Sequence, residues 1–147
     1  MAQRQMNPAP THSIPGPLLV IHDAEYVPGV CNIGPAEIAH RRAFGHVGFA
    51  ASVVLLGLLL AINAPAWARL LLFFTAAGSA TGYLQAMFHF CAGFGSRGVY
   101  NFGAVGTEHA VAEAADRARD RRRSLQITAG SVAIGLAVAI AAFLLPL

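Results

Sequence analysis

The stretch AFGHVGFAASVVLLGLLLAI, residues 43–62, decides the fold class of this chain, because it contains no charged side chain. Two further stretches share this property, LLLFFTAAGSATGYLQAMFHF at residues 70–90 and the C-terminal residues 125–147. A helix needs about 20 predominantly apolar residues to cross the hydrocarbon core of a bilayer, which is about 30 Å thick. The sequence therefore predicts three transmembrane helices, over about residues 43–62, 69–90 and 125–145.

The composition agrees with an all-α integral membrane protein. Of the 147 residues, 56% are hydrophobic and only 12% are charged, whereas about 25% are charged in a typical soluble domain. Residues 1–33 are rich in proline and glycine and lack sustained periodicity, so they are expected to form an extended or irregular N-terminal arm. We expect a three-helix membrane domain over residues 34–147, with a cytoplasmic loop at residues 91–124.

The distribution of arginine predicts the orientation of the helices. The chain has ten arginines and no lysine, and nine arginines lie before the first predicted span or between the second and the third. Only Arg69 lies where the connection between the first two spans meets the second span. Basic residues are enriched in cytoplasmic loops, so the N-terminus is expected inside and the C-terminus outside. The predicted location is the bacterial cytoplasmic membrane, with membrane lipid as a partner and no nucleic acid.

Local signals predict where several helices begin and end. Pro35 suits the first position of a helix and Glu37 favours the positive end of its dipole, so a helix is expected to begin there and run into the first span. Residues 63–67, NAPAW, predict a tight turn between the first two spans. Residues 107–124 predict a polar helix that is capped by Thr107 and leads into the third span.

The loop after the second span contains Gly93-x-Gly95-x-x-Gly98, the pattern of a dinucleotide-binding turn. This pattern has physical meaning only where a strand enters the turn and a helix leaves it. Here it follows a predicted membrane helix, so dinucleotide binding is not expected.

The same loop alternates glycine with aromatic residues, and it begins where the second span reaches the membrane surface. We expect it to contact lipid headgroups or a partner, since arginine suits paired hydrogen bonds to phosphate or carboxylate. The alternative is a loop that folds only onto its own protein. The expected docking or headgroup residues are Arg41, Arg42, Phe94, Ser96, Arg97, Tyr100 and Phe102.

One face of the second span combines small and polar side chains at spacings of three or four residues. A Gly-x-x-x-Gly pattern lets two helix backbones approach closely, and an amide within the membrane seeks a hydrogen-bond partner on a neighbouring helix. The neighbour is either another helix of this chain or another subunit. The residues of this predicted interface are Thr75, Gly78, Gly82, Gln85 and His89.

The turn between the first two spans also predicts which residues lie at equal depth in the membrane. Residues whose numbers sum to about 129 should match, so His46 should lie beside Tyr83 and His89 beside His40. His46 and His89 would then be separated by roughly 9 Å along the helix axis, at 1.5 Å per residue. This separation disfavours a haem held between the two histidines.

The equal-depth rule brings His40, His89 and Cys91 to the cytoplasmic rim of the membrane, where Cys31 could join them. Two cysteines and two histidines match zinc in ligand type, but their spacing fits no zinc-site template. Cysteines that face the cytoplasm ordinarily remain reduced thiols. We therefore expect no metal and no other cofactor, with this four-residue rim cluster as the alternative.

These observations leave three classes of function. The sequence has no P-loop and no HExxH motif, so we do not expect an enzyme. Apart from Arg69 at the first position of the second span, the predicted spans contain no charged residue, although proton relays and ion sites usually contain one. We expect a non-enzymatic accessory or scaffold subunit of a larger membrane complex, which docks other subunits or further copies of itself through its arm and cytoplasmic loop. The alternatives are a metal- or haem-binding redox component and a homo-oligomeric small transporter or channel.

Overall fold

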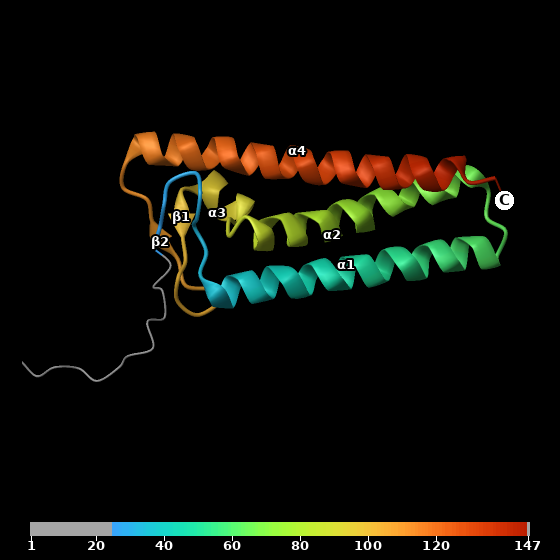
Figure 1. Ribbon diagram of the computed structural model, residues 1–147, viewed down its shortest axis with the longest axis horizontal. Coiled ribbons are helices and arrows are strands. Elements are labelled where there is room, and N and C mark those ends of the chain that lie inside the picture. Colours follow the sequence, from blue (N-terminus) through green and yellow to red (C-terminus); the bar gives the residue numbers. More distant parts are fainter. Residues whose placement is uncertain (1–24, 147) are drawn as a thin grey trace, which may run out of the picture.

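Three long helices lie side by side in the computed structural model, which describes residues 25–146. They are α1 (Pro35–Ala61), α2 (Leu72–Met87) and α4 (Ala114–Leu144). The chain runs in one direction along α1 and α4 and in the opposite direction along α2, which lies between them (Figure 1). Each is long and apolar enough to cross a membrane, α2 together with the preceding 3-10 helix η1 (Ala66–Leu71). The prediction of three such helices is confirmed.

The first helix begins where the sequence predicts. Gly34 is the extended N-cap of α1, Pro35 occupies its first turn, and Glu37 is the acidic residue of that turn. The helix then continues without a break into the apolar stretch and ends at Ala61, since no proline follows Pro35 before Pro65. Of the predicted N-terminal arm, residues 1–24 lie outside the described part of the chain.

The third long helix begins seven residues later than predicted, so the expected cap at Thr107 is wrong. The Thr107 hydroxyl instead donates a hydrogen bond of 2.6 Å to Asn101 Oδ1. Residues His109–Ala110 form a short strand, β2, which pairs antiparallel with β1 (Val99–Tyr100). These pairings hold residues 107–110 in an extended path, and α4 can begin only at Ala114.

The second helix ends before it reaches His89, which corrects the prediction that His89 shares a helical face with Thr75. The helix stops at Met87, and His89 adopts a left-handed backbone conformation with φ of 52°. A left-handed residue of this kind commonly ends a helix. The Phe90 amide then turns back to donate a hydrogen bond to the Gln85 carbonyl, at 3.0 Å.

The contact between α1 and α2 depends on glycine. A β-carbon built on Gly82 would lie 2.5 Å from the Gly45 nitrogen and 2.7 Å from the Arg41 carbonyl oxygen. Both of these are backbone atoms, so the two helices can approach this closely only without a side chain at that point. One turn further along, the Ser79 hydroxyl donates to the Gly45 carbonyl at 2.9 Å.

The predicted position of His46 beside Tyr83 in this helical hairpin is confirmed. His46 Nδ1 lies 2.6 Å from the Tyr83 hydroxyl, at the depth where the sequence places the two residues together. At the far end of the hairpin, the buried Arg69 side chain donates to the carbonyls of Ala142 and Leu145. A cation suits the last carbonyls of a helix, so Arg69 caps the C-terminus of α4.

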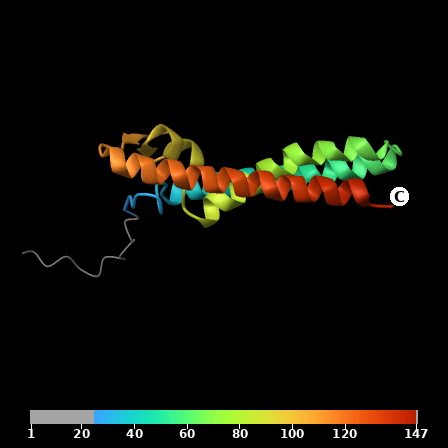
Figure 2. The ribbon, with the colours of Figure 1, turned by 90° about the horizontal axis from the view of Figure 1, so that it is seen from above.

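At the other end of the helices, two segments form a small folded cap over the beginnings of α1 and α4 (Figures 1 and 2). The cap consists of residues 26–34 and 91–113, and it contains the short helix α3 (Ala92–Arg97) as well as β1 and β2. Ile33, Cys91 and Phe94 form its hydrophobic core. A parallel bridge between Ile33 and Asn101 joins the two segments.

Candidate functional site

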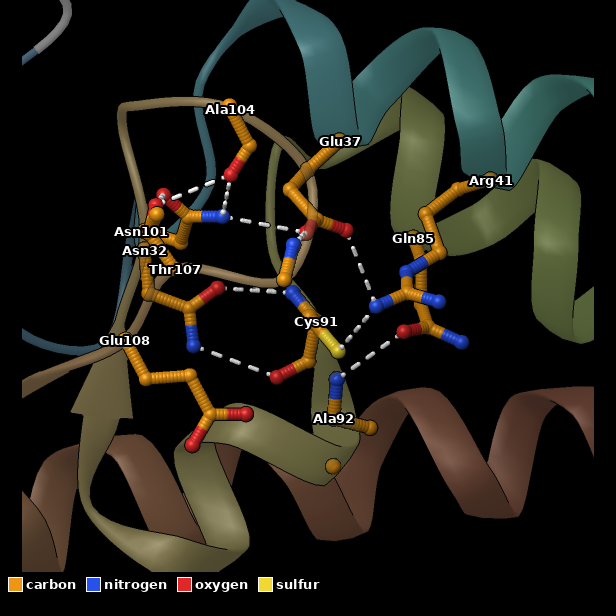
Figure 3. A network of polar contacts seen from close by, with 12 residues as sticks. Asn32, Glu37, Arg41, Gln85, Cys91, Ala92, Asn101, Ala104, Thr107 and Glu108 are labelled. Atoms are coloured by element: carbon orange, nitrogen blue, oxygen red, sulfur yellow. Dashed lines mark hydrogen bonds and ion pairs between the residues drawn. The ribbon is translucent and has the colours of Figure 1, made fainter.

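The two segments of the cap are joined by the side chain of Asn32, which is fully buried. Its Oδ1 accepts a hydrogen bond of 2.7 Å from the Cys91 amide, and its Nδ2 donates one of 3.1 Å to the Cys91 carbonyl (Figure 3). The Asn32 backbone continues the connection, since its nitrogen donates to His89 and its carbonyl accepts from Asn101. An amide side chain carries a donor nitrogen and an acceptor oxygen, so Asn32 bonds to both backbone groups of Cys91.

An ion pair between Glu37 and Arg41 lies beside these hydrogen bonds of Asn32. Glu37 Oε2 is 3.2 Å from Arg41 Nη2, one helical turn away, and the carboxylate is only 2% exposed. The other oxygen, Oε1, accepts from Asn101 Nδ2 at 3.1 Å and from the Gly106 amide at 3.3 Å. The ion pair and these hydrogen bonds offset the cost of burying the charge of Glu37. Glu37 thus connects the first turn of α1 to the loop of the cap.

The thiol of Cys91 belongs to the same network. Arg41 Nη2 donates to Cys91 Sγ at 3.2 Å (Figure 3). Beneath it, Gln85 Oε1 accepts from the Ala92 amide at 3.2 Å and so supports the first turn of α3. The side chains of Asn32, Glu37, Arg41 and Gln85 each bond to residues 91–113, so this structural network fixes the cap on the helices.

A second buried carboxylate attaches residues 26–34 to α4. Asp120 is fully buried; its Oδ2 accepts from the Tyr26 hydroxyl at 2.8 Å and its Oδ1 from the Gly29 amide at 2.6 Å. Burial and the neighbouring Asp120 carboxylate raise the pKa of Tyr26 well above its usual value. The Tyr26 ring also stacks on that of Tyr100, with ring centroids 4.8 Å apart.

Sequence reasoning missed most of this network. Asn32, Asn101 and Asp120 were not among the predicted site residues, and Glu37 was noted only as a helix-start residue. Their partners lie far away in the sequence, so no spacing rule applies to them. The signal that could have found them is an isolated amide or carboxylate beside a run of apolar and glycine residues, where burial requires a partner.

The predicted docking residues divide into buried and exposed groups. Phe94 is 6% exposed and packs in the cap core, so the expected position of its ring among headgroups or against a partner is wrong. Tyr100 and Phe102 are half-buried in an aromatic cluster. Ser96 and Arg97 are exposed, and the Arg97 guanidinium forms two hydrogen bonds with Glu108, of 3.1 and 2.7 Å. The two remaining residues, Arg41 and Arg42, are half-buried and exposed, respectively.

The rim cluster is not assembled in this structure. Cys91 is buried against Arg41, whereas His40 and His89 are exposed. Cys31 is half-buried, and this burial raises the pKa of its thiol. Within residues 25–146, no three His, Cys, Asp or Glu side chains come together in a geometry that could hold a metal ion.

The predicted interface on the second span is largely occupied by this chain itself. The Thr75 hydroxyl accepts from Ser52 on α1 at 2.8 Å, Gly82 packs on α1, and Gln85 supports α3. Gly78 differs, because a β-carbon at this position would meet no atom within 4 Å. A contact between Gly78 and another subunit stays a prediction.

The glycine pattern of the loop serves close packing between α3 and α4. A β-carbon on Gly95 would lie 2.5 Å from Ser124 Oγ and 2.7 Å from the Phe90 ring. Gly98 ends α3 with a left-handed φ of 69°, and a β-carbon there would lie 2.7 Å from Arg117 Cδ. Glycine adopts this conformation without steric cost. Two of the three glycines therefore have a packing role that explains the pattern without a nucleotide.

Comparisons of the chain with protein-family models, with curated proteins and with solved structures find no match.

Proposed function

We propose that this protein is a non-enzymatic scaffold subunit of a complex in the bacterial cytoplasmic membrane, and that its cap docks a partner subunit. The chain would cross the membrane three times, with the cap in the cytoplasm and the C-terminus outside. The distribution of arginine supports this orientation, because nine of ten arginines lie on the cap side of the predicted spans.

The observation on which the proposal rests is the use of buried polar groups in the cap. The network around Asn32 and Glu37 and the carboxylate of Asp120 bond to other segments of the same chain, and together they hold two distant segments in one shape. A rigid surface of this kind suits binding to a partner, because little conformational entropy is lost when it docks.

The cap exposes both apolar and charged side chains. Val27, Val30 and Val105 are each about half exposed, and the exposed Arg97–Glu108 pair lies on the same cap. Exposed apolar side chains are found in protein interfaces, and arginine is often among the residues that contribute most to binding. We define the docking patch by these five residues.

The orientation can be tested with reporter fusions. A reporter that is active only outside the cytoplasmic membrane is expected to be active after Leu147 and inactive within the cap, between residues 104 and 105. Alkaline carbonate extraction of membranes should leave the chain in the pellet if the helices are inserted. The reverse reporter pattern would contradict the proposed side of the cap.

The docking patch can be tested with two matched arginine variants. Arg97→Ala and Arg119→Ala each remove an exposed arginine from an exposed ion pair. Exposed pairs contribute at most about 1 kcal/mol to stability, so both variants should fold. On gentle purification from native membranes, Arg97→Ala is expected to retain about tenfold less partner, whereas Arg119→Ala should retain it fully. Equal retention by both variants would exclude Arg97 from the interface.

A further inference from the structure

The beginning of α4 combines a strong positive charge with two hollows in the protein surface. Five arginines lie within seven residues of this helix, immediately before the uncharged stretch that begins at Leu125. One hollow, of about 360 Å³, lies between α4 and the turn at Pro28–Gly29. The other, of about 460 Å³, lies between α4 and α3. Arg122 lines both of them. The five arginines are Arg117, Arg119, Arg121, Arg122 and Arg123.

The larger hollow, here called the basic hollow, has fixed walls. Arg117 Nη1 donates to the carbonyls of Val111 and Ala112, at 2.8 and 2.7 Å, so its guanidinium is held in place. Arg97 is held by its two bonds to Glu108. The basic hollow is lined by Arg97, Arg117, Arg121, Arg122, Ser96 and Leu125, among others.

The charge of the basic hollow is not neutralised by the acidic residues of α4. Asp116 pairs with Arg119 at 3.1 Å, and Asp120 is buried against Tyr26 and Gly29. In the part of the chain that the structure describes, neither Arg121 nor Arg122 has an acidic partner. Both side chains line the basic hollow, so two arginines without an acidic partner border it.

We propose that the basic hollow binds the phosphate of an anionic phospholipid from the cytoplasmic leaflet. The inference rests on the membrane insertion in the proposed function. Arginine bonds phosphate oxygens through paired N–H groups, and Ser96 lines the hollow with a further hydroxyl. Basic pockets beside transmembrane helices on the cytoplasmic side suit such headgroups.

The position of Leu125 favours a lipid over a soluble phosphate. This side chain lines the basic hollow, is 65% exposed, and is the first residue of the uncharged stretch of α4. A phosphate held by Arg121 and Arg122 would thus have its glycerol and acyl chains beside an apolar surface that continues into the membrane. A soluble anion would gain nothing from that surface.

Native mass spectrometry of the purified, delipidated full-length protein can test the site. The probes are dioleoylphosphatidylglycerol, dioleoylphosphatidylcholine and glycerol 1-phosphate, each added to wild type, Arg122→Gln and Arg42→Gln. Arg42 is an exposed arginine on α1 that lines neither hollow, so it controls for the loss of one charge. Wild type and Arg42→Gln are expected to retain one phosphatidylglycerol in preference to phosphatidylcholine. Arg122→Gln should retain about fivefold less, in line with about 1 kcal/mol for one arginine near a lipid surface.

The other outcomes overturn the proposal. Equal loss in Arg122→Gln and Arg42→Gln would mean a diffuse charge effect, and equal retention of the two lipids would remove the preference for an anionic headgroup. Binding of glycerol 1-phosphate as tight as that of the lipid would assign the site to a soluble anion. Arg121→Gln is a second variant on the same hollow and should repeat the result of Arg122→Gln.

Failure of the lipid site and failure of the scaffold proposal are distinguishable. Carbonate extraction tests insertion independently of any lipid preference. Arg122→Gln should also retain its partner subunit fully, because Arg122 lies outside the docking patch. A variant that loses lipid and keeps its partner supports both proposals.

Discussion

Gly82→Ala is expected to destabilise the folded protein by about 2 to 3 kcal/mol, the upper part of the range for overpacking a close contact. The added methyl group would lie 2.5 Å from the Gly45 nitrogen and 2.7 Å from the Arg41 carbonyl oxygen. These are backbone atoms of α1, so no side-chain rotation can make room, and the two helices must separate. The fall in Tm of the detergent-purified protein, followed by circular dichroism, measures the effect.

Gly78→Ala is the matched control on the same helix. A β-carbon at Gly78 meets no atom within 4 Å, whereas alanine is intrinsically better than glycine in a helix by about 1 kcal/mol. This variant should therefore keep or slightly raise the Tm. Equal destabilisation by both substitutions would show that the close contact at Gly82 is not the cause.

Asp120→Ala is expected to release residues 26–34 from α4, at a cost of about 3 kcal/mol or more for the local opening. The substitution removes the acceptor of both the Tyr26 hydroxyl and the Gly29 amide, and each hydrogen bond to a charged group contributes about 1.5 to 3 kcal/mol. Hydrogen exchange at the Gly29 amide and limited proteolysis within residues 26–34 measure the release. Asp116→Ala removes an ion pair with the exposed Arg119 on the same helix. It should leave the rates of hydrogen exchange and proteolysis nearly unchanged.

The hydrogen bond between Tyr26 and Asp120 predicts that the attachment of residues 26–34 to α4 depends on pH. The pKa of Tyr26 is raised in the folded protein, so the contribution of its proton to stability is fully present below the unfolded pKa of about 10. That contribution is lost as the pH rises above about 10 toward the folded pKa. Proteolysis within residues 26–34 should accelerate above pH 10 in wild type and much less in Tyr26→Phe. An identical pH profile for the two proteins would contradict a role for the phenol.

The long helices could be predicted from the sequence because their signal is local. An uncharged apolar stretch of about 20 residues predicts a membrane-spanning helix by its length alone. Pro35 and Glu37 indicate a helix start independently of the rest of the chain. The position of His46 beside Tyr83 also followed from the sequence, since a short turn leaves an antiparallel helix pair one register.

The candidate sites depended on contacts between distant segments. Residues 91–113 contain turn-forming glycines and short polar runs, which predict a loop and do not say what the loop packs against. Thr107 shows the difficulty: its sequence context is that of a helix cap, yet its hydroxyl bonds to Asn101 within the cap. The basic hollow required the packing of α3 on α4, because Arg97 and Arg121 are separated by 24 positions.

The sequence by itself determined the three apolar helices, because hydropathy is a local property of each stretch. It also determined that His46 lies beside Tyr83, because the turn between the first two helices is short. Only the tertiary structure decided that Asn32 forms hydrogen bonds with Cys91, 59 residues away, and that Tyr26 donates one to Asp120, 94 residues away. The physical reason is that a buried donor or acceptor must find a partner, but any polar group that packing brings within reach can satisfy it. Which group that is depends on how the helices and the cap pack together.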